Sequence, residues 1–118
     1  MVYCINTVGT RLYKGTNLGS CDDRNGHGTH VAGIIAASLD NVGVAGEAPK
    51  VKLIAVKVLS DSGSGYYSDI AEGIIEAVKA GAAILSMSLG GPSDSSVLRD
   101  VSYWAYQQGA VQVLAAGN

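Results

Sequence analysis

The stretch Arg24–Ala37, RNGHGTHVAGIIAA, contains both histidines of the 118-residue chain. Glycines flank His27, His30 follows three residues later, and an apolar run comes directly after them. The run from His27 to Leu39 predicts a buried helix with Asn25 as a cap just ahead of it. The glycines let the backbone pass close to a ligand at the start of this helix, where a neutral imidazole can accept a proton near pH 7. We therefore expect His27 to be functional and His30, one turn further along, to be a hydrogen-bonded structural residue.

Two plainer interpretations of the histidine pair stay open at this point. Residues at i and i+3 share a helix face, so the pair is compatible with a metal site that has a third ligand. Cys21, Asp22 and Asp23 lie nearby, but their spacing is not that of a zinc site. The other alternative is a purely structural pair, against which the flanking glycines argue.

Composition restricts the class of protein. Hydrophobic residues make up 47% and charged residues 15% of the chain, which indicates a folded domain with a buried core. The net charge is −2 and no basic cluster is present, so we expect neither nucleic acid nor a membrane surface as a partner. No apolar stretch approaches the roughly 20 residues that span a bilayer, and the first residues do not form a signal peptide. The two cysteines, Cys4 and Cys21, are equally compatible with a disulfide and with free thiols, and a disulfide would favour an exported protein.

Hydrophobic periodicity predicts that strands and helices alternate. This order predicts an α/β fold of three layers, in which a parallel sheet carries helices on both faces. The polar segment 7–24 is expected to be a loop, and Asp69 and Glu72 are expected to form a capping box. The expected strands are Val2–Asn6, Val51–Leu59, Ala83–Ser88 and Val111–Ala115, the last three in one sheet, and the expected helices are His27–Leu39, the segment from Asp69 to near Gly81, and Ser95–Gln108 with Val97, Leu98, Val101 and Ala105 inward.

The segment NGHGTHVAG resembles the histidine block of the subtilisin-like serine proteases. Four further segments are similar to this family in the family's own order: GVAGEAPKVKLIAVKVL, GSGYYSDIAEGI, ILSMSLGGP and VLAAGN. The resemblance covers Asn25–Asn118 and implies that residues 1–118 are the central part of a subtilase catalytic domain with a subtilisin-like sheet. It also implies a serine endopeptidase that acts on proteins or peptides, is secreted, and is monomeric when intact.

The resemblance implies roles for particular residues. His27 would be the general base of the catalytic triad, and the Asn118 side chain would donate a hydrogen bond to the oxyanion. Substrate would pair with the backbone of one segment and enter a pocket lined by another. These substrate-binding residues would be Gly63, Ser64, Gly65, Tyr67, Ile70, Ser88, Leu89 and Gly90.

The loop from Ser38 to Val44 is similar to a calcium loop of the family. Ca²⁺ prefers oxygen ligands, which the Asp40 side chain and the carbonyls of Ser38, Val42 and Val44 would supply. The alternative is an ordinary polar loop. We expect structural calcium in the intact protein, with further ligands from other segments.

The sequence departs from the family pattern at two catalytic positions. The family's order is Asp, His, Ser, but no aspartate precedes Asp22, and Asn6 stands where a faint echo of the aspartate block occurs. The nucleophile block is also absent, so we expect the aspartate upstream of Met1 and the serine beyond Asn118. Residues 1–118 alone are then expected to be inactive. One alternative is a catalytically dead binding module on the same scaffold. Another is a nucleotide-binding domain, but the chain has neither a full glycine fingerprint nor a P-loop, which argues against it.

Overall fold

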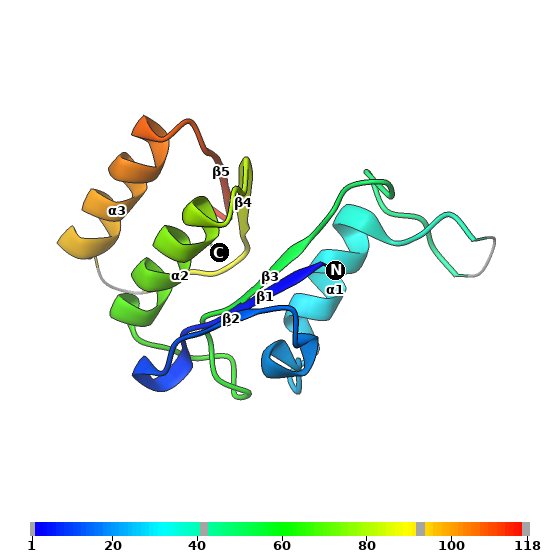
Figure 1. The fold of residues 1–118 in the computed structure, drawn as a ribbon, viewed down its shortest axis with the longest axis horizontal. Coiled ribbons are helices and arrows are strands. Elements are labelled where there is room, and N and C mark those ends of the chain that lie inside the picture. The colour runs from blue at the N-terminus through cyan, green and yellow to red at the C-terminus, as the bar shows by residue number, and fades with distance from the viewer. Residues whose placement is uncertain (1, 41–42, 92–93, 117–118) are drawn as a thin grey trace.

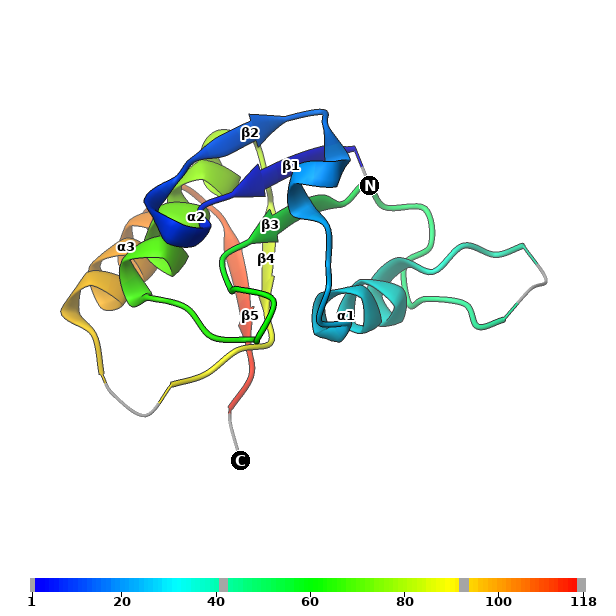
Figure 2. The same ribbon diagram turned by 90° about the horizontal axis from the view of Figure 1, so that it is seen from below.

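The computed structural model describes residues 2–40, 43–91 and 94–116. Strands lie between two groups of helices: α1 is on one side, and α2 and α3 pack together on the other (Figures 1 and 2). This arrangement confirms the three-layer α/β class. In chain order the elements are β1 (Tyr3–Asn6), the short 3₁₀ helix η1 (Val8–Thr10), β2 (Tyr13–Gly15), the 3₁₀ helix η2 (Leu18–Cys21), α1 (His27–Ala36), β3 (Ile54–Lys57), α2 (Tyr67–Lys79), β4 (Ile84–Met87), α3 (Ser96–Gln107) and β5 (Val111–Leu114).

The strands form two sheets, so the expectation of a single sheet is wrong for the part of the chain described. The first sheet has the order β2-β1-β3, in which β1 is antiparallel to β2 and parallel to β3. The second sheet pairs β4 with β5 in parallel, from Ile84 opposite Val111 to Met87 opposite Leu114. Adjacent strands must lie about 4.8 Å apart to pair. The crossover through α2 carries the chain from β3 to β4 without bringing these two strands into register.

Helix α2 supplies the centre of the hydrophobic core. Ile70 and Ile74, one turn apart on the apolar face of this amphipathic helix, are 5% and 8% exposed. They pack with Ile5 of β1, Leu85 of β4 and Ala105 of α3, so one helix joins both sheets and the neighbouring helix. A Cβ at Gly73 would overlap a methyl group of Val58, so this glycine allows α2 to approach the end of β3 closely.

The segment 7–24 is more ordered than a loop. It contains the short strand β2 and both 3₁₀ helices, and a disulfide joins Cys4 of β1 to Cys21 at the end of η2. The sequence is equally compatible with a disulfide and with free thiols, and the structure shows the disulfide. Lys14 of β2 forms an ion pair of 3.0 Å with Glu76 of α2. A three-residue strand rich in polar side chains has no periodicity to reveal it, because its partners lie elsewhere in the chain.

The two helix caps turned out differently. Ser95, expected to be the first residue of its helix, instead caps α3, because its side chain accepts a hydrogen bond from the Leu98 amide. The capping box at Asp69 is wrong, since α2 begins at Tyr67 and Asp69 lies buried in its first turn. There its carboxylate accepts a hydrogen bond from the Gly9 amide, so a contact 60 residues away in sequence replaces the local one. Val97, expected to point inward, is 51% exposed.

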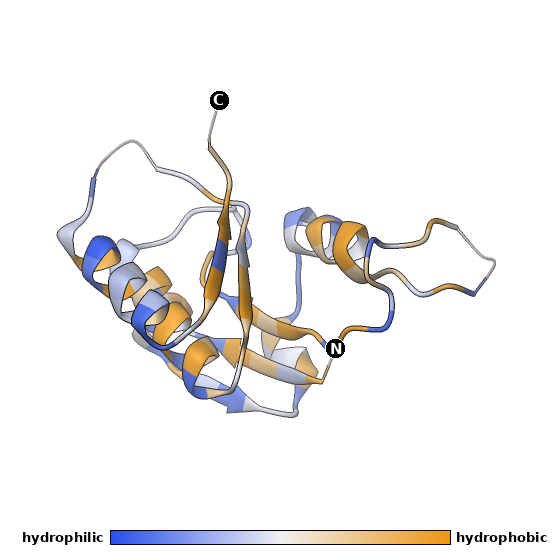
Figure 3. Ribbon diagram, turned by 90° about the horizontal axis from the view of Figure 1, so that it is seen from above, coloured by the Kyte–Doolittle hydropathy of each residue, from blue (hydrophilic) through white to orange (hydrophobic). Residues whose placement is uncertain are grey.

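Helix α1 is shorter and less buried than expected. It ends at Ala36 because the amides of residues 46–48 return to bond its last carbonyls, among them Gly46 to Ala37 at 3.0 Å. No residue of α1 is buried, and Ile34 is 57% exposed. The strands β4 and β5 also carry exposed apolar residues, such as Val111 and Leu114. Figure 3 shows the hydrophobic colouring along both of these strands and along α1.

Candidate active site

Asp23 fixes the backbone turn in which His27 lies. One carboxylate oxygen accepts hydrogen bonds from the amides of Asn25 and Gly26, at 3.0 and 2.9 Å. The other accepts from the amide and the hydroxyl of Thr29, at 2.8 and 2.7 Å. The hydroxyl of Thr29, followed by these amides, holds the pKa of the Asp23 carboxyl well below its usual range. This carboxylate thus satisfies amides at the start of α1, and Gly26 accommodates the turn with a φ of 98°.

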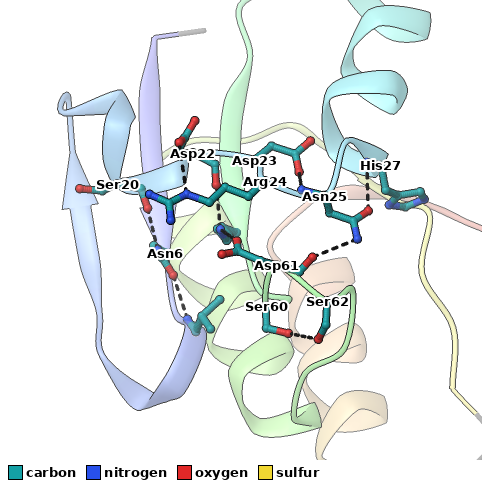
Figure 4. A network of polar contacts seen from close by, with 12 residues as sticks. Asn6, Ser20, Asp22, Asp23, Arg24, Asn25, His27, Ser60, Asp61 and Ser62 are labelled. Atoms are coloured by element: carbon teal, nitrogen blue, oxygen red, sulfur yellow. Dashed lines mark hydrogen bonds and ion pairs between the residues drawn. The ribbon is translucent and has the colours of Figure 1, made fainter.

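Asn25 joins this turn to a second loop. Its side-chain oxygen accepts a hydrogen bond from the His27 amide at 3.3 Å. The expected cap at Asn25 is wrong, because Gly26 occupies the cap position of α1 and no side chain caps the helix there. Its side-chain nitrogen donates to the Asp61 carbonyl at 3.1 Å. Figure 4 shows Asn25 between His27 and Asp61. His27 and His30 are both exposed, and His27 is the first residue of the helix.

Lys57 makes a second connection between the same two loops. It is the last residue of β3, and its ammonium group donates to the Asp22 carbonyl and to the Asp61 carboxylate, both at 2.7 Å. Its side chain is 21% exposed. From the sequence alone, Asp23, Lys57 and Asp61 are not predicted to position the histidine turn. An aspartate just before the helix start was a signal for the first, whereas the other two are brought to the histidine turn only by the fold.

The loop 60–65, which contains the expected substrate-binding residues Gly63, Ser64 and Gly65, lies beside this turn and is exposed from Asp61 onward. Its shape is set by its own hydrogen bonds, including the Ser60 amide to the Ser64 carbonyl at 2.8 Å. A Cβ at Gly63 would lie 3.5 Å from the Asn25 side-chain nitrogen, so this glycine is next to the histidine turn. A Cβ at Gly65 would come within 2.7 Å of the Val58 carbonyl oxygen, which explains the need for glycine there. Residues 61–65 of this loop are exposed.

The second expected substrate segment follows β4. Ser88 and Gly90 are exposed and Leu89 is partly buried against the core. A Cβ at Gly91 would overlap the Tyr67 hydroxyl, so Tyr67 reaches from the start of α2 to this segment. The structure thus brings Tyr67 together with the segment 88–90. Ile70, in contrast, lies in the hydrophobic core and offers no accessible wall here.

The remaining predicted residues are placed only in part. Asn118 lies outside the described residues; β5 leads toward it, and its parallel pairing with β4 makes both strands end at one edge. Asn6 accepts a hydrogen bond from the Val8 amide at 2.9 Å and donates to the Ser20 carbonyl at 2.6 Å, so it shapes a local turn. His27 thus lies at the start of α1, and Asn25 joins its turn to the loop 60–65.

The expected calcium loop leaves α1 and returns to it. Ser38, Asp40 and Val44 are exposed, and Val42 lies outside the described residues. Across the residues that the structure places, no three His, Cys, Asp or Glu side chains gather into a metal site. Asp40 and the Ser38 and Val44 carbonyls are oxygen donors of the kind that Ca²⁺ prefers, but a complete shell takes about 6–8 oxygens. These residues fit calcium chemistry only with additional ligands.

The fold is a three-layer α/β arrangement with His27 at the start of α1, and comparison with known proteins identifies the family. The model of the Subtilase family matches residues 7–118, so this chain belongs to the subtilases. Its backbone is similar to that of the solved structure of Sphericase, with a TM-score of 0.85 and 44% sequence identity. That match covers 98% of this chain and 39% of Sphericase.

Several named proteases are similar in sequence. Subtilisin DY of Bacillus licheniformis is 54% identical over 96 residues, and Thermitase of Thermoactinomyces vulgaris is 50% identical over 95 residues. The Major intracellular serine protease of Bacillus subtilis (strain 168) is 53% identical over 97 residues. These matches cover 80–81% of this chain but only 30–35% of the relatives. The chain therefore spans about a third of the length of the curated relatives it matches.

Proposed function

We propose that the full-length protein is a serine endopeptidase in which His27 is the general base. The observation that carries this proposal is the position of His27 at the first residue of α1, hydrogen-bonded through Asn25 to the exposed loop 60–65. Membership of the subtilase family supports the same reading. The imidazole would accept the proton of a serine hydroxyl as that oxygen attacks the peptide carbonyl, and would then give the proton to the leaving amine. The Asn118 amide would donate to the oxyanion.

The nucleophile and the aspartate that orients His27 would come from segments other than residues 1–118. Asp23 already receives four hydrogen bonds, and Asp22 lies 3.7 Å from Arg24. We therefore propose that residues 1–118 are part of a catalytic domain and have no peptidase activity by themselves.

Labelling with a fluorophosphonate, which requires an activated serine, tests the function. The full-length protein should be labelled and should cleave peptides, whereas His27→Ala should lose both properties. His30→Gln is the matched control, because His30 lies exposed one turn further along the same helix. An unlabelled full-length protein would favour the alternative, a binding module that has kept the scaffold without its activity.

The substrate class follows from the two exposed loop segments. We propose that extended peptides bind as an added strand along the loop 60–65, with an apolar residue near Tyr67 and Leu89. The substrate-binding residues 63–65 and 88–90 include no charged side chain. A peptide panel should therefore favour apolar over charged residues before the scissile bond, and a strong preference for Lys or Arg there would contradict this proposal.

We also propose that the protein binds structural calcium and is exported. Calcium would bind Asp40 and the carbonyls of Ser38, Val42 and Val44, with the remaining ligands from other segments. The Cys4–Cys21 disulfide supports an oxidising compartment. In the part of the chain described, no helix is long and apolar enough to cross a membrane. Signal-sequence mapping of the full-length protein would test export. This test is needed because one relative is by name intracellular.

A further inference from the structure

Three side chains form a polar clamp between the turn that holds His27 and the loop 60–65. The clamp consists of Asn25, Lys57 and Asp61. Asp61 is held from two directions: its carboxylate accepts from Lys57 at 2.7 Å, and its carbonyl accepts from Asn25 at 3.1 Å. Figure 4 shows two of its members, Asn25 and Asp61, joined between the start of α1 and the loop after β3.

Lys57 anchors the clamp to the sheet. As the last residue of β3, which pairs along its length with β1, it has a backbone fixed by the parallel ladder. Its ammonium group also donates to the Asp22 carbonyl, so one cation holds both loops. Hydrogen bonds in which the donor or the acceptor is charged are shorter and stronger than neutral ones. The 2.7 Å distances agree with that description.

The Asn25 side chain couples the position of the loop 60–65 to that of His27. One end of its amide accepts from the His27 backbone, and the other end donates to Asp61. A displacement of Asp61 would therefore move the loop 60–65 relative to His27. Small displacements matter in catalysis, because a misplacement of about 1 Å can cost about 100-fold in rate.

We propose that Lys57 and Asp61 are positioning residues that hold the loop 60–65 in register with His27. This inference rests on the proposed function. The clamp acts on the substrate through the loop, so its contribution grows with the length of peptide that lies along the loop. A substrate that reaches only the reacting bond depends on it far less.

The experiment compares two substrates in the full-length protein. One is a peptide long enough to pair with the loop 60–65, and the other is a small activated ester. Lys57→Met keeps the aliphatic stem without the charge, and Asp61→Asn keeps the shape and the backbone carbonyl. Each variant should lower kcat/KM for the long peptide by about tenfold, equal to about 1.4 kcal/mol, and leave kcat/KM for the ester within about twofold. Lys57→Arg, whose guanidinium still donates to two acceptors, should recover most of the loss.

Lys14→Met is the matched control. It removes a similar ion pair, that of Lys14 with Glu76 at 3.0 Å, which joins β2 to α2 away from the loop. Its ratio of peptide to ester activity should equal that of the wild type. If Lys57→Met does not fold, as judged by its melting curve, Asp61→Asn decides the matter.

Two results would overturn the inference alone: an active wild type whose Lys57 or Asp61 variants cleave both substrates normally, or variants that lose both activities equally, as a general loss of stability would. A wild type that cleaves neither substrate would overturn the proposed function and, with it, this inference.

Discussion

Asp23 shows how one side chain prepares a site without touching substrate. Its carboxylate accepts four hydrogen bonds from three residues around His27, namely Asn25, Gly26 and Thr29. These donors include amides at the start of α1, where the partial positive charge of the helix favours an anion. The turn is thus held by an ionised carboxylate and depends on its charge.

Replacing Asp23 by asparagine should lower the stability of residues 1–118 at pH 7. The donors depress the pKa of Asp23 in the folded state. The ionised carboxylate therefore stabilises the fold fully only above the pKa that Asp23 has in the unfolded chain, about 3.9. This stabilisation is lost as the pH falls through that value toward the lower folded pKa. Urea midpoints should therefore separate wild type from Asp23→Asn at pH 7 and converge below pH 3.

Asp94→Asn is the control for this comparison. Asp94 pairs with Arg99 at 2.8 Å, but both side chains are about two-thirds exposed, and exposed pairs contribute little. Its midpoint should stay near that of the wild type at both pH values. A gap between wild type and Asp23→Asn that widened at low pH would contradict the assignment.

At the scale of elements, the contact between α2 and β3 depends on a glycine. A methyl group at Gly73 would overlap the Val58 side chain, and overpacking of this kind costs about 1–3 kcal/mol. Gly33, inside α1, has nothing within 4 Å of a Cβ, so alanine there should stabilise the helix by about 1 kcal/mol. Denaturation of Gly73→Ala and Gly33→Ala should shift the midpoint in opposite directions. A midpoint that rose for Gly73→Ala would refute the close approach of α2 to β3.

The disulfide constrains β1 and the segment that leads to the histidine turn. It closes a loop with a sequence separation of 17, which on the loop-entropy model contributes about 3 kcal/mol. Residues 1–118 with both Cys4→Ser and Cys21→Ser should lose about this much stability in urea denaturation. Reduction of the wild type should reproduce the loss, and reductant should leave the double variant unchanged. An unchanged midpoint after reduction would mean that the bridge does not constrain the unfolded chain as described.

For the molecule as a whole, the exposed apolar surface of α1, β4 and β5 is large for so small a chain. Ile34, Ile84 and Leu114 are each more than half exposed. Open strand edges and apolar faces of this kind favour association. The matched segments make up only 30–35% of the relatives, and the proposed calcium site also needs ligands from elsewhere.

Calcium should raise the melting temperature of the full-length protein, because a ligand that binds only the folded state stabilises it. Chelation should lower the melting temperature, and Asp40→Ala should remove the difference between the chelated and calcium-loaded samples. Asp94→Asn, at a distant exposed aspartate, should keep the dependence. A melting curve that chelator does not change would count against calcium at the Ser38–Val44 loop.

The sequence by itself determined the order of the three α-helices and of the four strands β1, β3, β4 and β5, and the start of α1, but not β2 or the two 3₁₀ helices. Apolar periodicity located α2, α3 and the last three strands, because each of these patterns is local. The histidine block put His27 at a helix start. The family followed from the same blocks, since their order along the chain is itself sequence information.

Only the tertiary structure decided which strands pair and which polar groups meet. The split into two sheets, the β1–β3 pairing and the Cys4–Cys21 bridge join residues far apart in the chain. The Asp69 carboxylate accepts a hydrogen bond from the Gly9 amide instead of forming the local capping box. Lys57 contacts Asp22 and Asp61 because the fold places the end of β3 beside both loops. Long-range contacts of this kind depend on chain closure and shared burial, which no short window of sequence records.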